Sequence, residues 1–199
     1  MSEIVRTLYI RPPFANNWIM DNWVILFVRT GTEEELVVTL RNRLNAKEYF
    51  PFFPAKELPY KTKGIFRKVR MPLFPGYLFI KTAIEPQSIA GNLKAVLRED
   101  DDFPNDIFRL LHYGKDKNNV VVRESERIFW ENLLDADFCI GESKGIIEGD
   151  RVRVVSGPLV GREGLIKRID RHKRKAIIES EMMGSVHRVM VMLEVVGRE

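Results

Sequence analysis

Two short apolar runs, residues 23–28 and 77–80, are the clearest signals of secondary structure in the chain. The first has the sequence WVILFV, and the second follows a Pro-Gly pair in the stretch LFPGYLFIK at residues 73–81. Aromatic and β-branched residues suit a pleated surface and a Pro-Gly pair indicates a turn, so both runs are predicted to be strands. Because successive side chains of a strand point to opposite faces, each strand is apolar on both faces. Either helices cover both faces of the sheet, or one face is left open for a partner.

Residues 32–47, which follow the first run, have the pattern of an amphipathic helix. Thr32 and Glu35 have the spacing of a capping box, and the three glutamates at residues 33–35 suit the positive end of the helix dipole. Three leucines recur at every fourth position from Leu36 and predict an apolar stripe that faces a sheet. A strand, a turn and an amphipathic helix together predict an α/β layer.

The segments between the two runs and after them carry weaker patterns. Residues 49–58 contain three Phe and two Pro, and since proline cannot donate to a central ladder, they predict an edge strand or an irregular segment. Residues 60–70 contain five Lys or Arg around Gly64 and predict a solvated hairpin arm or loop. The further expected elements are a helix at 88–97, strands at 107–113 and 120–122, and a helix at 124–134 with Ile128, Phe129 and Leu133 on its apolar side.

After residue 148 the chain consists of short apolar runs separated by turn residues. A turn at every eight to twelve positions or so is typical of a small β-barrel. Residues 135–149, just before, hold three glycines and four acidic residues, a composition that favours a linker. The predicted organisation is an irregular extension at 1–22, an α/β domain at 23–134, a linker at 135–147 and a barrel at 148–199.

The composition is that of an ordinary globular protein, with 45% hydrophobic and 30% charged residues in a length of 199. Cys139 is the only cysteine, which excludes an intrachain disulfide and favours a reducing compartment. No apolar run approaches the roughly 18 residues of a membrane span. Arg6 and Arg11 interrupt the apolar core that a signal peptide would need. We therefore expect a cytoplasmic protein with no membrane partner.

No constellation of residues indicates catalysis, which needs convergent acid, base, nucleophile or metal groups. His112, His172 and His187 are far apart along the chain, and no Cys or His pair has metal-ligand spacing. No glycine-rich phosphate loop follows a strand. The protein is therefore expected not to be an enzyme and to have no catalytic residue, no metal and no cofactor.

Residues 167–175 concentrate positive charge in a chain whose net charge is +4. The segment holds six Lys or Arg and a single acidic residue, Asp170. One interpretation is a solvated hairpin tip. The other is a patch that contacts RNA phosphates, because neighbouring like charges repel one another unless a polyanion neutralises them. The candidate RNA-binding residues are Lys167, Arg168, Arg171, His172, Lys173, Arg174 and Lys175.

Two parts of the chain resemble a known family. Residues 23–28 with the helix after them and the stretch LFPGYLFIK resemble the amino-terminal (NGN) domain of NusG, and GDRVRVVSGPLVGREGLIKRID at 149–170 resembles a KOW motif. In this order, the pair is similar to NusG transcription elongation factors over nearly everything after residue 22. The resemblance implies an α+β fold: an NGN sandwich, in which helices flank an antiparallel sheet, followed by a small SH3-like KOW β-barrel.

The resemblance also implies a partner, RNA polymerase, whose clamp helices contact an apolar patch on the NGN sheet in this family. Matched position by position, the polymerase-binding residues are Phe27, Tyr77, Phe79 and Leu110. This assignment agrees with the prediction that the strands are apolar on both faces of the sheet. One face would pack on helices, and the other would receive a partner. The alternative is that these aromatic side chains belong to the core.

Three features resemble a specialised branch of the family, the LoaP antiterminators, more than general NusG. Arg162 stands in a barrel loop where general NusG proteins commonly have an aromatic residue, residues 100–122 form a long, diverged segment, and the tip DRHKRK at 170–175 is strongly basic. This branch acts on selected long operons, and its KOW domain is associated with RNA recognition. This resemblance implies a protein that binds nascent RNA at a structured leader. We expect the protein to be a monomer. The alternatives are a general NusG that couples transcription to Rho or to a ribosomal protein, and a ribosome-associated KOW protein that binds RNA.

Overall fold

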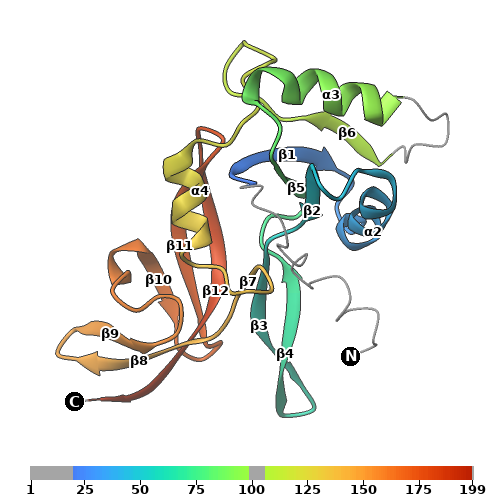
Figure 1. Cartoon of the computed structure of the whole chain (residues 1–199). Coiled ribbons are helices and arrows are strands. Elements are labelled where there is room, and N and C mark those ends of the chain that lie inside the picture. Colours follow the sequence, from blue (N-terminus) through green and yellow to red (C-terminus); the bar gives the residue numbers. More distant parts are fainter. Residues whose placement is uncertain (1–19, 99–105, 199) are drawn as a thin grey trace. The chain divides into compact units, whose positions relative to one another are not determined.

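The structure, a computed structural model, describes residues 20–98 and 106–198 and divides into two compact units (Figure 1). The first unit comprises the described residues up to Phe53 together with Phe74–Arg127. The second comprises Pro54–Leu73 together with the described residues from Ile128 onward. The chain therefore leaves the first unit at Pro54, contributes a segment to the second, and returns at Phe74.

An antiparallel sheet of four strands, in the order β2-β5-β1-β6, is the centre of the first unit. Helix α2 packs on β2 and β5, and helix α3 runs along the sheet (Figure 1). Pro51 has no N–H to donate, which suits the edge position of β2. The predicted α/β layer and edge strand are therefore confirmed. The elements are β1 (Asn22–Val28), α2 (Glu33–Arg43), β2 (Tyr49–Phe52), β5 (Tyr77–Thr82), α3 (Pro86–Arg98) and β6 (Ile107–Leu110).

The centre of this sheet is covered on both faces. Ile25 of β1 pairs with Phe79 of β5, and both side chains are fully buried. The next pair, Leu26 and Leu78, points to the opposite face and is fully buried as well. Trp23 contacts Phe79 edge to face, with ring centroids 5.9 Å apart. Both faces of the central strands therefore belong to the core, and only their ends are open to a partner.

The second unit contains a two-stranded arm, which confirms the hairpin predicted at residues 60–70. Lys63 and Gly64 form its turn, and their φ angles of 50° and 83° are both positive. A type I′ turn needs positive φ at both central positions and matches the twist of a hairpin. The arm consists of β3 (Ala55–Thr62) and β4 (Ile65–Pro72), and β3 also pairs with the short strand β7 (Cys139–Ile140).

The rest of the second unit is a five-stranded sheet in the order β10-β11-β12-β8-β9, which curls into a small β-barrel (Figure 1). The long strand β12 pairs antiparallel with β11 and then parallel with β8. The predicted α+β fold, an NGN sandwich followed by an SH3-like KOW barrel, is confirmed. The elements are β8 (Ser143–Glu148), β9 (Arg151–Ser156), the 3₁₀ turn η1 (Glu163–Leu165), β10 (Ile166–Asp170), β11 (Lys175–Met182) and β12 (Ser185–Arg198).

Residues 135–147, which were expected to be a linker, contain β7 and most of β8. Cys139 of β7 is buried and pairs with Ala55 of β3. Ser143 of β8 is fully buried and pairs with Leu193 of β12. These residues are strands because their partners lie elsewhere in the chain, which local composition does not reveal. The predicted domain limits stay predictions, and the compact units divide the chain differently.

Helix α4 (Glu124–Glu131) is shorter than the helix predicted at 124–134, and its predicted apolar side is buried only in part. Leu133, which follows the helix, is buried as expected, whereas Ile128 is 44% exposed and Trp130 is fully buried. The Trp130 indole N–H donates to the backbone carbonyl of Glu181 in β11 at 3.3 Å. In a helix this short, one large aromatic side chain with a polar partner decides which side is buried.

The strand predicted at residues 120–122 is not formed. The backbone N–H of Val122 donates to the carbonyl of Trp23 at 2.7 Å, and the side chains of Val120 and Val122 are buried. The apolar run therefore reflects burial beside β1. A short apolar run does not by itself distinguish a strand from another buried segment.

Candidate polymerase-binding surface and nucleic-acid interface

Phe27 and Tyr77 form an aromatic pair at one end of the sheet in the first unit. They lie directly opposite each other across β1 and β5, with ring centroids 5.9 Å apart and planes inclined by 59°. Both side chains are half-buried, in contrast to the fully buried residues at the centre of the sheet. The pair is therefore the part of the predicted polymerase-binding patch that is open to solvent.

Phe79, the third residue of the predicted patch, belongs to the core. Its side chain is 0% exposed. Its ring lies 5.6 Å from that of Phe52 and 6.0 Å from that of Phe74, measured between centroids. Phe79 points to the same face as Tyr77 but lies two residue pairs further into the sheet. It is therefore removed from the candidate patch, because strand alternation predicts the direction of a side chain and not its depth.

Leu110, the fourth predicted residue, points to the wrong face. It pairs with Leu26, whereas Phe27 pairs with the preceding residue, Arg109. Paired residues share a face, so Leu110 lies on the face opposite to Phe27. The guanidinium carbon of Arg109 is 5.5 Å from the centroid of the Phe27 ring. Arg109 therefore takes the place of Leu110 in the candidate patch, and only the strand register identifies it.

A buried carboxylate, that of Glu33, braces the loops beside the aromatic pair. Glu33 is 2% exposed. One carboxylate oxygen accepts the backbone N–H of Gly76 at 2.7 Å, and the other accepts that of Gly31 at 2.8 Å. Hydrogen bonds to an ionised acceptor are stronger than neutral ones. Glu33 therefore joins the loop after β1 to the turn before β5, a role that the run of three glutamates did not reveal.

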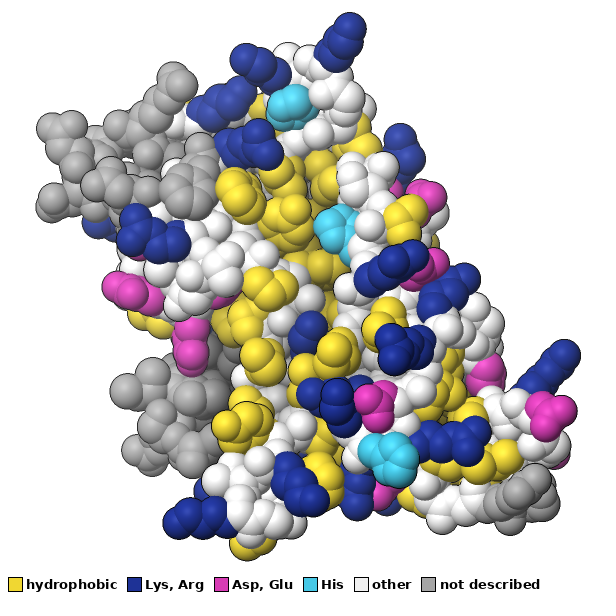
Figure 2. All heavy atoms as spheres, turned by 180° about the vertical axis from the view of Figure 1, so that it is seen from behind, with side chains coloured by type: hydrophobic (Ala, Val, Ile, Leu, Met, Phe, Trp, Pro, Cys, Tyr) yellow, Lys and Arg dark blue, Asp and Glu magenta, His cyan; other side chains and the backbone are white. Residues whose placement is uncertain are grey.

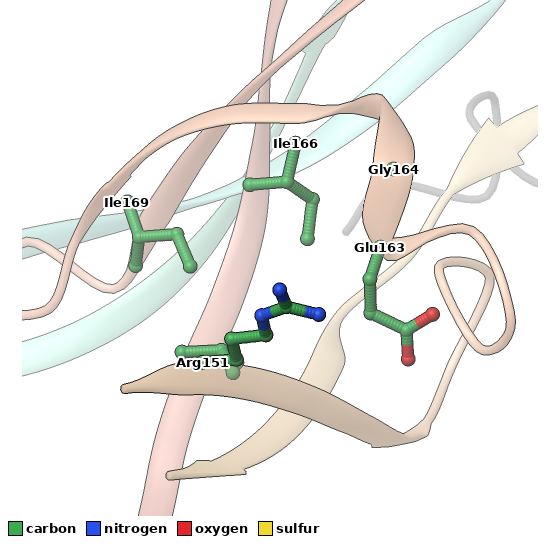
Figure 3. A pocket seen from close by; sticks show the side chains of 6 residues that line it. Arg151, Glu163, Gly164, Ile166 and Ile169 are labelled. Atoms are coloured by element: carbon green, nitrogen blue, oxygen red, sulfur yellow. The ribbon is translucent and has the colours of Figure 1, made fainter. Parts of the chain in front are cut away.

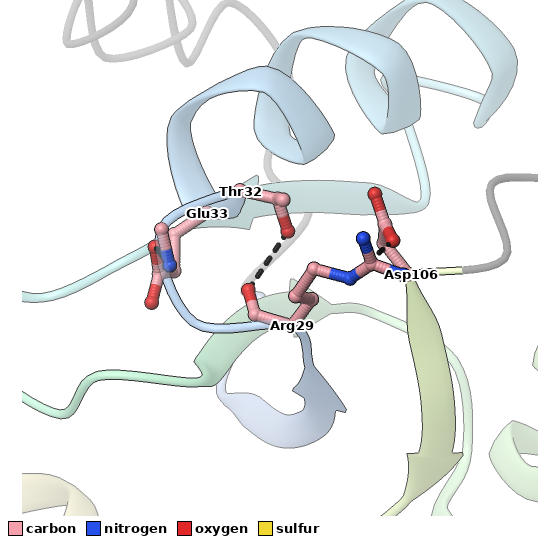
Figure 4. Close-up of polar contacts among 5 residues, drawn as sticks. Arg29, Thr32, Glu33 and Asp106 are labelled. Carbon is pink, nitrogen blue, oxygen red and sulfur yellow. Dashed lines mark hydrogen bonds and ion pairs between the residues drawn. The ribbon is translucent and has the colours of Figure 1, made fainter.

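Two further contacts fix the end of β1 (Figure 4). Arg29 forms an ion pair with Asp106 at 2.8 Å, and its backbone N–H donates to the Asp106 carbonyl at 2.7 Å, which joins β1 to the start of β6. The Thr32 hydroxyl donates to the Arg29 carbonyl at 2.8 Å and makes no capping bond to α2. The predicted capping box is therefore wrong.

Gly76 allows the turn before β5 to approach β1 closely. Its φ of +84° lies in the left-handed region, and a Cβ there would be 3.1 Å from Thr30 Oγ1 and 3.5 Å from the Phe27 ring. The backbone N–H of Val28 donates to the Gly76 carbonyl at 2.8 Å. The Pro-Gly signal in the sequence thus marks the turn that positions the aromatic pair.

The basic segment predicted at 167–175 forms the tip of the β10–β11 hairpin. Asp170 pairs with Lys175 across the hairpin, and its carboxylate accepts the backbone N–H of Lys173 at 2.9 Å. That bond also lowers the pKa of Asp170. The one acidic residue of the segment therefore stabilises the turn. Five predicted RNA-binding side chains are exposed, Lys167, Arg168, Arg171, His172 and Lys173, whereas Arg174 and Lys175 are half-buried.

Arg174 takes part in the packing of the second unit. Its guanidinium pairs with the Glu194 carboxylate at 2.9 Å, and the guanidinium carbon lies 4.5 Å from the centroid of the Phe66 ring in the β3–β4 arm. These contacts hold Arg174 between β12 and the arm. It is therefore the least accessible of the predicted RNA contacts that carry a guanidinium.

The exposed cations of the tip are at most weakly paired. Lys167 lies 3.8 Å from the Glu179 carboxylate, and Lys173 makes a similar exposed pair of 3.7 Å. Exposed pairs of this kind contribute about 0–1 kcal/mol, so they do not prevent a phosphate contact. Arg168 and Arg171 make no ion pair with any residue that the structure describes. About four cations of the tip are therefore available for contacts with an anionic partner.

A cavity of about 320 Å³ lies between β9 and β10, the two edge strands of the barrel sheet (Figure 3). The Arg151 side chain extends into it, beside apolar side chains from both strands. The Glu163 carboxylate accepts the backbone N–H of Val154 at 2.9 Å, so it stabilises the barrel. Such a lining suits an apolar side chain of a partner. The lining residues are Arg151, Val152, Glu163, Gly164, Ile166 and Ile169.

The described residues hold no group of His, Cys, Asp and Glu that could bind a metal ion. Burial raises the pKa of the Cys139 thiol to about 12, so that thiol is not an activated nucleophile. None of the helices in the described ranges is both long and apolar enough to cross a bilayer.

Comparison with protein-family models gives two matches. The model described as "Transcription termination factor nusG" matches residues 21–126, and the model described as "KOW motif" matches residues 148–181. A comparison with curated proteins finds no match. The first match spans more than half of the 199 residues and covers the four-stranded sheet of the first unit together with the β3–β4 arm of the second. The chain therefore belongs to the NusG family of non-enzymatic transcription elongation and termination factors.

Proposed function

We propose that this protein is a specialised antitermination factor of the LoaP kind. It binds RNA polymerase through the NGN domain and nascent RNA through the KOW domain, and it promotes read-through of terminators. One observation carries this proposal. The two domains present surfaces of different chemistry, a half-exposed aromatic pair in one and an exposed cationic hairpin tip in the other.

The aromatic pair supports the polymerase contact. The Glu33 carboxylate joins the loop after β1 to the turn before β5, so hydrogen bonds within the chain hold together the loops beside Phe27 and Tyr77. Aromatic anchors in an ordered setting are typical of the residues that dominate protein interfaces. Arg109 adds a cation at the rim of the pair, where it can reach a carboxylate on a helix of polymerase.

The hairpin tip supports the RNA contact. Its exposed cations project from a turn whose only carboxylate is bonded to the backbone. Cations that contact phosphates release counterions, which gives an affinity that falls steeply with salt. The tip is well suited to the phosphates of a structured leader in the nascent transcript.

A run-off transcription assay tests the function. The template carries a terminator downstream of a candidate leader, and it is transcribed with and without the protein and with and without the leader. We expect increased read-through only when the protein and the leader are both present. Read-through that needs no leader, or no increase at all, contradicts specialised antitermination.

The polymerase surface is tested by Tyr77→Ala, with Val38→Ala as the matched control. Val38 is an exposed apolar residue on α2, in the same unit but outside the patch. Loss of an interface anchor costs about 2 kcal/mol or more, so Tyr77→Ala is expected to weaken polymerase binding about 30-fold. Equal affinities of the two folded variants contradict this assignment of the surface.

The cavity between β9 and β10 favours a second candidate, a general NusG that couples transcription to Rho or to a ribosomal protein. Its apolar lining offers a place for a partner side chain at the open edge of the barrel. Titration of the protein with Rho and with the ribosomal partner distinguishes the two functions. Micromolar or tighter binding that Ile169→Asp abolishes favours the general role.

A further inference from the structure

The β3–β4 arm has an exposed face that the proposed function does not use. Tyr60 of β3 pairs with Arg67 of β4, so their side chains share this face, which we call the outer face. Tyr60 is 62% exposed and Ile65, near the turn, is 61% exposed. A contiguous patch of exposed apolar side chains commonly marks a site for a partner. Lys56, Leu58 and Thr62 share this face by pairing with Met71, Val69 and Ile65, and Leu58 is buried. The exposed part of the outer face consists of Tyr60, Thr62, Ile65, Arg67, Val69 and Met71.

The opposite face of the arm is occupied by contacts within the second unit. Phe66 packs under the Arg174 guanidinium, 4.5 Å from ring centroid to guanidinium carbon. Lys68 pairs with Glu142 at 3.0 Å, and Arg70 donates to a backbone carbonyl at 2.6 Å. These contacts hold the arm in place through the face opposite to Tyr60.

The charge of the arm indicates what kind of partner fits the outer face. Residues 60–70 contain five Lys or Arg and no Asp or Glu. Neither Lys63 nor Arg67 makes an ion pair with any residue in the described part of the chain. Figure 2 shows Lys and Arg side chains interspersed with hydrophobic ones on the face that it draws. Aromatic and apolar side chains among unneutralised cations match the bases and phosphates of a single-stranded nucleic acid.

The β3–β4 arm contacts the β10–β11 tip. Arg174 belongs to the tip and Phe66 to the arm, and the two side chains are stacked. Lys56, at the base of the arm, has a pKa lowered by burial and then by the nearby cation of Lys175. The arm and the tip are therefore neighbouring cationic hairpins of one compact unit.

We propose that the outer face of the β3–β4 arm binds a single-stranded segment of the RNA whose phosphates contact the β10–β11 tip. Bases stack on the Tyr60 ring and on the Arg67 guanidinium beside it, and Lys63 at the turn contacts a phosphate. This inference rests on the proposed function, in which the tip binds RNA. It extends the RNA site from a single hairpin to two.

The test measures fluorescence anisotropy of a labelled oligouridylate of about 20 nucleotides, longer than the roughly 4–16 nucleotides of a single-strand site. The full-length chain and its variants are titrated over a series of salt concentrations. The arm variants are Tyr60→Ala and the double substitution Lys63→Gln with Arg67→Gln, and the tip variant is Arg168→Gln with Arg171→Gln. The control removes two exposed charges from the first unit, Lys115→Gln with Lys117→Gln.

We expect Tyr60→Ala to weaken binding at least about fivefold, because one stacked base is lost. The double arm variant is expected to reduce the slope of log K against log salt by about 0.7, because Lys63 is the one phosphate contact that it removes and a single strand gives about 0.7 for each contact. The control is expected to change neither quantity. Circular dichroism confirms that each variant is folded.

The possible outcomes distinguish this inference from the proposed function. If only the tip variant weakens binding, the arm is not a binding surface and RNA binding by the tip stands. If the arm variants weaken binding and the tip variant does not, the RNA site assigned to the tip is wrong, and with it the extended site. If oligodeoxythymidylate of the same length binds equally well and responds to the same variants, the assignment to RNA is overturned.

Discussion

At the residue scale, Phe79 is expected to contribute to stability and Tyr77 to binding. The two side chains share a face of β5, but Phe79 is fully buried and Tyr77 is half-buried. Phe79 is fully buried between Trp23, Phe52 and Phe74. Phe79→Ala leaves a cavity and is expected to lower the free energy of unfolding by about 3–5 kcal/mol. Tyr77→Ala removes a half-buried ring and is expected to cost clearly less. Urea denaturation followed by fluorescence measures both, and equal losses would place Tyr77 in the core.

Tyr113 and Glu126 form a buried polar pair in the first unit. The Tyr113 hydroxyl donates to a Glu126 carboxylate oxygen at 2.6 Å and accepts the Arg123 backbone N–H at 3.0 Å. Burial and the bond to Glu126 raise the pKa of Tyr113, so the phenol stays protonated and keeps donating.

Tyr113→Phe removes the hydroxyl and leaves the buried carboxylate without this donor. The expected loss is about 1–3 kcal/mol of unfolding free energy, measured by denaturant titration at neutral pH. A double substitution with Glu126→Gln is expected to cost less than the sum of the single changes, because the two groups share one contact. Strict additivity would show that the pair does not interact.

Glu163 makes the stability of the barrel depend on pH. Backbone N–H groups, first its own and then that of Val154, lower the pKa of Glu163 below its ordinary value of 4.5. The stabilisation is therefore complete above pH 4.5 and is lost as the pH falls through the lower, folded-state pKa. Glu163→Gln keeps an acceptor oxygen but has no charge to lose.

We expect the stability advantage of the parent protein over Glu163→Gln to be greatest at neutral pH and to shrink as the pH falls below 4.5 and through the lower, folded-state pKa. Thermal unfolding at a series of pH values measures this difference. A difference that does not change with pH would mean that the folded-state carboxyl has an ordinary pKa.

At the scale of elements, the turns of the KOW motif show why its glycines are not equivalent. Gly157 has a φ of +92°, and a Cβ there would lie 2.3 Å from the Glu142 carbonyl oxygen. Gly161 has a φ of +70° and nothing within 4 Å of such a Cβ. Gly157→Ala is therefore expected to destabilise the protein by clearly more than the roughly 1–2 kcal/mol that a left-handed φ costs, whereas Gly161→Ala costs only that amount.

Thermal unfolding of the two variants measures these costs. Gly157→Ala adds a close contact with the backbone to the strain of a positive φ, whereas Gly161→Ala adds only the strain. Equal shifts in melting temperature would mean that the chain around Gly157 relaxes without cost. The comparison is internal, since both glycines lie in the same motif and both have positive φ.

Most elements were predictable from local sequence signals, and the exceptions have a common reason. The strands β1 and β5 follow from apolar runs, α2 from its leucine period, and the arm from its basic composition around Gly64. The expected linker is strand because β7 and β8 have partners at Ala55 and Leu193. The missing strand at 120–122 lacks such pairing. Local sequence patterns therefore do not predict which strands pair with segments that are distant in the sequence.

At the scale of the whole molecule, charge predicts how RNA binding responds to salt. We propose that about four exposed cations in the tip contact phosphates, so log K is expected to fall with log salt at a slope of roughly −3 to −4. Electrophoretic mobility shift with a candidate leader RNA at several salt concentrations measures the slope. A slope near zero, or no binding at low salt, would contradict the phosphate contacts. Contacts by the arm would make the slope steeper.

The sequence by itself determined the kinds of element, their order, the family, and the concentration of charge at residues 60–70 and 167–175. These properties depend on residues close together in the chain, through side-chain period, turn chemistry and composition. Only the tertiary structure decided that Phe79 is buried and that Arg109 replaces Leu110 beside Phe27. It also assigned Glu33 and Arg174 to structural contacts. Depth, strand register and ion pairing each require a partner that is distant in the sequence, and folding alone brings that partner into contact.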